Sequence, residues 1–187
     1  ALEQLLPILD LQVNGAMPFS TLISPDKRII DFLFGAHPDR IDESYDRFFS
    51  RLTGDADLEP FLANQGVLDA LNISYDDGGR IFSLFGDEGS GRKFTIRHFC
   101  RDRSLSCISI NCAKLFVYDF RFVEKALWAA TRECILSDAC VCLDNLSYRD
   151  EEKDKFFGYM DLAFGRFTAR NITVFTASKE KLPMKQM

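Results

Sequence analysis

The stretch Ile81–Thr95 reads IFSLFGDEGSGRKFT and holds a short apolar run, a glycine-rich turn and the start of a segment with helical spacing. The apolar run over 81–85 predicts a buried strand, and the apolar residues from Ile96 onward lie on one side of the helix that we expect to follow. Glycine lets the backbone approach a ligand closely. Because the N–H groups of such a loop and of the first helical turn point at one spot, this order predicts an anion-binding site.

The spacing of the glycines resembles the P-loop pattern G-x-x-x-x-G-K-[ST]. Gly86 and Gly91 match its two glycines, Arg92 stands at the lysine position, and Lys93 stands at the Ser/Thr position that binds magnesium. The residues expected to surround a phosphate are Gly86, Asp87, Glu88, Gly89, Ser90, Gly91, Arg92 and Lys93. Within this set the acid Glu88 should point to solvent. An ordinary strand–helix connection is the alternative interpretation.

The composition limits the class of protein. The chain has 187 residues, of which 47% are hydrophobic and 27% charged, and this suits one medium domain with a packed core, with or without a smaller appendage. A net charge of −5 argues against a general nucleic-acid or anionic-membrane binder. The sequence shows no apolar run long enough to span a bilayer and no signal-peptide pattern at its start. It begins with Ala1 rather than methionine, which is compatible with a piece cut from a longer protein.

The chain contains six cysteines and two histidines, and no two cysteines have C-x-x-C spacing. Cys140 and Cys142 alternate within an apolar run, so we expect them on the same face of one strand. We interpret the thiols as reduced, buried, apolar residues of a cytoplasmic protein. A metal site built on these thiols is the less favoured alternative, because a zinc site would need better spacing.

The part of the chain before the predicted strand over 81–85 reads as small helices joined by loops, without a group of residues typical of a catalytic site. The predicted helices are a leucine stripe over 2–11, a helix that starts at Ser24 and Pro25 and ends at Gly35, and two more over 41–52 and 58–71. The polar stretch YDDGG at 75–79 marks a boundary. We therefore predict a helical N-terminal segment or linker over 1–75 and an α/β core over 80–187.

Strands and helices alternate after this boundary. The predicted strands lie over 106–110, 139–143 and 171–175, and the predicted helices over 120–136 and 153–170. Continuous apolar strands with helical crossovers indicate an α/β fold, a parallel sheet with helices on both faces. Ligands of such sheets bind at the carboxyl ends of the strands. Here those ends carry the glycine turn, Asp144 and the group Thr176–Ser178.

Asp144 follows the apolar run ACVCL directly. An acid at the end of a buried strand can hold a hydrated magnesium ion beside a nucleotide phosphate. By itself Asp144 would be interpreted as a turn residue, since Asp favours turns. The glycine loop earlier in the chain makes the magnesium interpretation the favoured one, and we expect Asp144 to lie beside the turn over 86–91.

From Ile81 to Ser178 the chain resembles AAA+ ATPases, which are P-loop NTPases. GDEGSGRK at 86–93 is similar to the Walker A motif, CVCLDN at 140–145 to Walker B, and FTAS at 175–178 to the end of the sensor-1 strand. The stretch PFSTLISPDKRIIDFLFG at 18–35 is similar to the linker between a winged-helix region and the ATPase core in a bacterial subgroup, some members of which accompany contractile injection systems.

The resemblance implies a set of roles and partners. ATP or ADP would bind at the glycine loop, Asp144 would hold Mg²⁺ directly or through water, and Ser178 or Thr176 would sense the terminal phosphate. The chain would assemble as a homo-oligomer through its AAA+ core, within a larger remodelling or assembly ATPase with a protein partner that the sequence does not identify. Neither a membrane nor a nucleic acid is expected as a partner.

The sequence departs from the family at the groups that hydrolyse ATP. Asn145 replaces the glutamate that polarises the attacking water, and an amide cannot accept a proton. Lys93 removes the hydroxyl that coordinates magnesium, and Arg92 can bind phosphate only as a planar fork. The fifth strand, the lid and the region leading to the arginine finger have no counterpart before Met187, and such a finger is worth about 10³–10⁵ in rate. We expect nucleotide binding with slow or absent hydrolysis.

Two other functions stay open at this point. One is a degenerate P-loop scaffold or partner-docking module without nucleotide turnover, which the substitutions at Arg92, Lys93 and Asn145 favour. The other is a DNA-binding module based on a winged helix in the N-terminal part. The acidic net charge and the lack of a basic recognition helix argue against the second.

Overall fold

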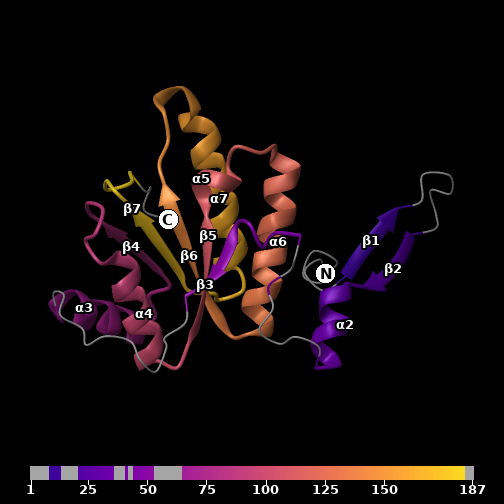
Figure 1. The fold of residues 1–187 in the computed structure, drawn as a ribbon, viewed down its shortest axis with the longest axis horizontal. Helices are drawn as coiled ribbons and strands as arrows, with labels where there is room; N and C mark the ends of the chain where they lie inside the picture. The colour runs from indigo at the N-terminus through magenta and orange to yellow at the C-terminus, as the bar shows by residue number, and fades with distance from the viewer. Residues whose placement is uncertain (1–8, 14–20, 36–40, 42–43, 53–64, 184–187) are drawn as a thin grey trace.

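The computed structural model describes residues 9–13, 21–35, 41, 44–52 and 65–183. The elements, in chain order, are β1 (Leu9–Val13), β2 (Thr21–Pro25), α2 (Lys27–Leu33), β3 (Phe49–Arg51), α3 (Gln65–Asp76), β4 (Ile81–Phe85), α4 (Arg92–Asp102), β5 (Ser106–Asn111), α5 (Cys112–Leu115), α6 (Phe120–Leu136), β6 (Ala139–Leu146), a 3-10 turn (Asp150–Glu152), α7 (Lys153–Thr168) and β7 (Val174–Ser178) (Figure 1). None of these helices is both long and apolar enough to cross a membrane.

A five-stranded sheet with the order β3-β5-β6-β7-β4 forms the centre of the described structure. β4, β5, β6 and β7 run parallel, and β3 pairs antiparallel with β5 at one edge. The predicted α/β fold with a largely parallel sheet is therefore confirmed. β7 lies between β4 and β6, so the glycine loop after β4 and Asp144 on β6 are separated by one strand.

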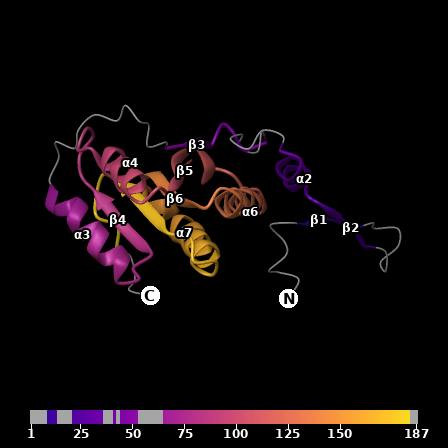
Figure 2. The same cartoon turned by 90° about the horizontal axis from the view of Figure 1, so that it is seen from below.

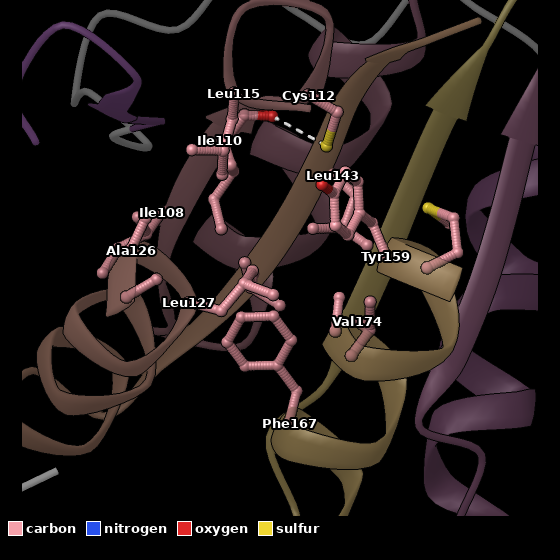
Figure 3. Packing of buried hydrophobic residues seen from close by; sticks show 14 of the residues in the cluster. Ile108, Ile110, Cys112, Leu115, Ala126, Leu127, Leu143, Tyr159, Phe167 and Val174 are labelled. Atoms are coloured by element: carbon pink, nitrogen blue, oxygen red, sulfur yellow. Dashed lines mark hydrogen bonds between the residues drawn. The ribbon is translucent and has the colours of Figure 1, made fainter. Parts of the chain in front are cut away.

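The two faces of the sheet carry separate apolar cores, which confirms that helices cover both faces. On one face Leu127 of α6 and Phe167 of α7 pack on Ile108 and Val174 (Figure 3). On the other face residues of α3 and α4 pack on β4, β6 and β7. Figure 2 shows α4 and α7 on opposite sides of the sheet. Cys140 and Cys142 both belong to the second core, so the prediction that they share a face is confirmed.

The helix predicted over 2–11 is wrong in its described part. Leu9–Val13 forms β1, which pairs antiparallel with β2. Residues 2–8 of that prediction lie outside the described residues. The next helix starts later than predicted, because Ser24 and Pro25 belong to β2 and Asp26 caps α2, its Oδ1 accepting from the Arg28 amide at 2.8 Å. The predicted end at Gly35 is confirmed, since α2 stops at Leu33 and Gly35 has a φ of 71°.

The helix predicted over 41–52 is also wrong. Residues 44–48 form turns, and Phe49–Arg51 forms β3, which pairs with β5 from Phe49 opposite Ile110. Pairing with a distant strand overrides the helical spacing, and bulky aromatic residues suit a strand that is buried on one side. Phe48 and Phe49 are both buried in the core that α6 and α7 cover.

The helix predicted over 58–71 is confirmed from Gln65 and continues to Asp76 as α3; residues 58–64 lie outside the described part. Its Leu68 and Leu71 share a core with Phe82 and Ile96. The division of the chain into 1–75 and 80–187 remains a prediction, although β3 and α3 from the first part pack into the layers of the second.

In the second half, α6 has the predicted bounds, 120–136, and β5, β6 and α7 confirm their predictions with shifts of at most a few residues at the ends. The strand predicted over 171–175 begins only at Val174 and runs to Ser178. The reason is the end of α7: Asn171 takes a left-handed φ of 56° and Ile172 donates its amide to the Phe167 carbonyl at 3.0 Å.

An internal ion pair ties α2 to the long helix α6. Arg28 Nε lies 3.0 Å from Glu133 Oε1, and the Glu133 side chain is fully buried. Arg132, next in sequence to Glu133, forms an ion pair with the cap residue Asp26. The start of α2 is therefore held by charges on α6 rather than by its own short helical sequence.

Candidate phosphate-binding site

The loop between β4 and α4 has a backbone that only glycine adopts readily. Gly86 has a φ of 155°, Gly89 a φ of 82° and Gly91 a φ of 78°. A Cβ atom on Gly86 would also lie 2.9 Å from Ser90 Oγ, too close for an ordinary contact. The glycine spacing seen in the sequence is thus a requirement of this loop conformation.

The loop leads straight into the N-terminus of α4. Gly91 is the N-cap, and the first backbone bond of the helix runs from the Thr95 amide to the Gly91 carbonyl at 2.8 Å. The N–H groups of the residues before Thr95 point along the axis, out of the helix end. Together with the helix dipole they favour an anion at this position.

Arg92, the residue at the lysine position, braces the loop. Its Nη1 donates to the carbonyl oxygens of Gly86 and Ser178. The amide of Gly86 in turn donates to the carbonyls of Ser178 and Lys179, each at 3.2 Å. The start of the glycine loop is therefore fixed to the end of β7 by backbone and side-chain bonds together. A guanidinium has five N–H donors, so these bonds leave others for a ligand.

Lys93, at the Ser/Thr position, forms an ion pair with Asp144 Oδ2. The Asp144 side chain is 7% exposed and the Lys93 side chain 49% exposed. β7 lies between β4, which precedes the glycine loop, and β6, which holds Asp144. The Lys93–Asp144 pair therefore reaches across β7. The glycine loop and the acid within β6, the Walker B-like strand, are therefore joined by the Lys93–Asp144 ion pair.

Asn145 lies at an irregularity of β6. The register with β7 shifts between Leu143 and Leu146, and Asn145 has a left-handed φ of 53°. Its side chain is exposed, whereas Asp144 beside it is buried. Asparagine tolerates this conformation better than most residues. The bulge therefore places the consecutive residues Asp144 and Asn145 in different surroundings, the first buried and the second exposed.

Of the two expected sensor residues, Ser178 lies nearer the loop. Its carbonyl accepts from Arg92, and its hydroxyl donates to the Glu180 carbonyl at 2.7 Å. Thr176 is fully buried, and its hydroxyl donates to Ser83 Oγ of β4 at 3.1 Å. Thr176 thus contributes to the contact between β4 and β7, and Ser178 to the base of the loop.

The remaining loop residues are open to solvent. They are Asp87, Glu88, Gly89 and Ser90. The expectation that Glu88 is exposed agrees with this position. The two acids offset the charges of Arg92 and Lys93, so the loop as a whole carries no net charge.

A cavity of about 680 Å³ opens beside the loop, along the edge strand β4. Val67 and Ala70 of α3 and Leu84 of β4 contribute apolar walls. Ser90 and Arg92 of the loop contribute polar groups at one end. An apolar cavity with a few polar groups at one end is typical of small-molecule sites.

A cluster of three thiols lies in the core under α4. The sulfur atoms of Cys100, Cys107 and Cys140 all lie within 4.8 Å of one another. They come from α4, β5 and β6, so spacing in the sequence could not reveal the cluster. Hydrogen bonding to Cys100 and burial raise the pKa of Cys107, and burial raises the pKa of Cys142 to about 12. Hydrogen bonds with Cys107 and Cys140 lower the pKa of Cys100, so this thiol of the cluster ionises more readily than Cys107.

The sequence matches no protein-family model and no curated protein. Among solved structures, Trip13 from Rhizobiales aligns with a TM-score of 0.33 and 14% sequence identity. The alignment covers 87% of this chain and 62% of that chain, so it spans less than two thirds of the solved protein. At this level of likeness the alignment assigns no role to any residue.

Proposed function

We propose that this chain is an AAA+-type nucleotide-binding domain in which residues 86–93 bind the phosphates of ATP or ADP. The observation that carries the proposal is the glycine loop at the carboxyl end of β4, which opens directly into the N-terminus of α4. The N–H groups of the first turn of α4 are open there and the helix dipole adds a positive field, whereas the amides of Gly86 and Ser90 already donate within the chain. The chain as a whole is acidic, with a net charge of −5. The attraction for an anion in this proposal therefore comes from the local field of the loop and the helix end.

Residues near the loop support the binding of the remaining parts of a nucleotide. Arg92 lies at the loop, with guanidinium donors beyond those it gives to Gly86 and Ser178. The cavity along β4 adjoins Ser90 and Arg92 and can receive an apolar ring. Ser178 lies at the base of the loop, where a side chain could respond to the terminal phosphate.

Hydrolysis is slow or absent in this proposal. Asn145 cannot act as a general base. Magnesium, which the family resemblance implies, does not fit the residues present: Lys93 replaces the coordinating hydroxyl, and its ammonium group is paired with Asp144. At positions 93 and 145 the chain therefore lacks the metal-binding hydroxyl and the general base that active family members use for hydrolysis.

The test is thermal melting of the chain with ATP or ADP. A ligand that binds only the folded state stabilises it by about 2.7 kcal/mol at a hundredfold excess over its dissociation constant. Arg92→Ala should abolish the shift, whereas Lys125→Ala, at an exposed lysine on α6, should retain it. Absence of any shift at saturating nucleotide would reject nucleotide binding.

A second candidate function is a scaffold or docking module that binds no nucleotide. The observation in its favour is that both basic side chains of the loop already have partners within the chain, Arg92 at two carbonyls and Lys93 at Asp144. Calorimetry with nucleotide separates the two functions, because a scaffold releases no heat of binding.

Oligomeric assembly belongs to the first proposal. AAA+ domains act in rings, so we propose that the chain associates with further copies of itself as part of a larger remodelling or assembly ATPase in the cytoplasm. The buried free thiols are those of a reducing compartment. Sedimentation with and without nucleotide tests the association: a single monomer species under both conditions would contradict it.

A further inference from the structure

We propose that the ammonium group of Lys93 takes the place of the divalent cation in this site, so that nucleotide binds without magnesium. The inference rests on the proposed function and concerns the use of Asp144. Its basis is the ion pair between Lys93 and Asp144. In P-loop sites both of these positions hold the magnesium ion.

The geometry places a positive charge where the ion would lie. In a P-loop site the Ser/Thr hydroxyl and the Walker B aspartate are joined through one Mg²⁺, which requires ligand oxygens at about 2.0–2.1 Å. In this chain Lys93 Nζ and Asp144 Oδ2 are joined directly. An ammonium group has three donors and no acceptor, so it cannot serve as a metal ligand.

Burial makes this arrangement hard to exchange for a metal. The Asp144 side chain is 7% exposed, and a buried carboxylate needs a compensating charge. Lys93 supplies it from within the chain. A divalent ion at Asp144 would have to displace the ammonium group or bear its repulsion at contact distance.

In the part of the chain that the structure describes, no His, Cys, Asp or Glu group of three includes Asp144 at a spacing that could share an ion. Asn111, opposite Asp144 in the register with β5, uses its side-chain oxygen to accept from the Lys114 amide at 3.2 Å. Among the described residues, the three-ligand group close enough for a shared ion is the thiol cluster Cys100, Cys107 and Cys140, which does not include Asp144.

The Lys93 side chain is only partly used by its contact with Asp144. About half of its side chain is open to solvent at the start of α4, next to the glycine loop. The ammonium group can therefore pair with Asp144 and donate to a phosphate oxygen at the same time, as a magnesium ion bridges the two in other P-loop sites. Such a site favours the free nucleotide anion over its magnesium complex.

The test is calorimetry of the complete chain with ADP, once in EDTA and once in excess magnesium chloride. We expect binding in EDTA at least as tight as in magnesium. Lys93→Thr restores the hydroxyl and removes the ammonium group, and it should lose at least about tenfold in affinity in EDTA while magnesium restores binding. Lys125→Thr, at an exposed lysine on α6, is the matched control and should behave as the unmodified chain.

A second readout includes the unmodified chain, whose result does not depend on how well the variant folds. Electron paramagnetic resonance of Mn²⁺ with ADP should show the free Mn–ADP spectrum with the unmodified chain, and a protein-bound spectrum with Lys93→Thr. Binding of ADP by the unmodified chain only when magnesium is present would overturn the inference and leave the proposed function standing. No binding under either condition would overturn both.

Discussion

Lys93 at the start of α4 and Asp144 near the end of β6 form an ion pair in which the acid is almost fully buried and the lysine is half exposed. The pair joins the glycine loop to a strand that is not adjacent to β4 in the sheet. It therefore contributes to the position of α4 on the sheet, whatever ligand binds at the loop.

Removal of Lys93 should destabilise the chain more than removal of both partners. Lys93→Met leaves a buried carboxylate without its countercharge, whereas the double variant Lys93→Met with Asp144→Asn leaves none. We expect a coupling energy of about 1–3 kcal/mol in the double-mutant cycle, measured by urea unfolding. Additive effects of the two substitutions would show that the pair does not contribute to stability.

The buried Arg28–Glu133 ion pair between α2 and α6 should contribute more to stability than an exposed ion pair does. Glu133 is fully buried and keeps Arg132, whose Nε lies 3.7 Å from Glu133 Oε1, so Arg28→Ala should cost about 1.5–3 kcal/mol in unfolding free energy by removing its hydrogen bonds to a buried charge. Arg101→Ala removes an exposed pair with Asp102, in which both side chains are 40% exposed, and should cost less than about 1 kcal/mol. Equal losses for the two variants would contradict the burial argument.

Glycine substitutions should change stability in opposite directions according to conformation. Gly91→Ala places a Cβ at a φ of 78° and should destabilise by about 1–2 kcal/mol. Gly158→Ala lies within α7, where an added Cβ meets nothing within 4 Å, and should stabilise by about 0.8–1.0 kcal/mol. Thermal melting of both variants without ligand measures the contrast, and stabilisation by Gly91→Ala would exclude the left-handed loop.

Stability should fall at alkaline pH because of buried thiols. Burial raises the pKa of Cys142 to about 12 from the ordinary value of 9.0 for a thiol, so folding favours its protonated form. This contribution is complete below pH 9.0 and is lost as the pH rises from there toward about 12, because only the unfolded chain ionises in that window.

The slope above the unfolded pKa should reach about 1.4 kcal/mol per pH unit for one such thiol. Urea unfolding at a series of alkaline pH values measures it. Cys142→Ala should have a shallower slope than the unmodified chain, since one thiol fewer ionises on unfolding. An unchanged slope would assign the alkaline loss to other groups.

Much of the site could be predicted from local sequence. The run Ile81–Phe85, the glycine spacing and the helix after it depend on neighbouring residues, and the structure keeps that order. The residues 44–51 show the limit of this approach. Their apolar residues have the spacing of a helix, and the sequence therefore predicts one. In the structure, pairing with β5 places Phe49 in a strand and buries it.

By itself, the sequence determined the alternation of strands and helices and the backbone of the glycine loop, because apolar runs and glycine act through residues close in the chain. Only the tertiary structure decided the strand order, the thiol cluster and the contact of Lys93 with Asp144. Each of these depends on segments far apart in the chain, and their meeting is set by how the whole sheet and its covering helices pack.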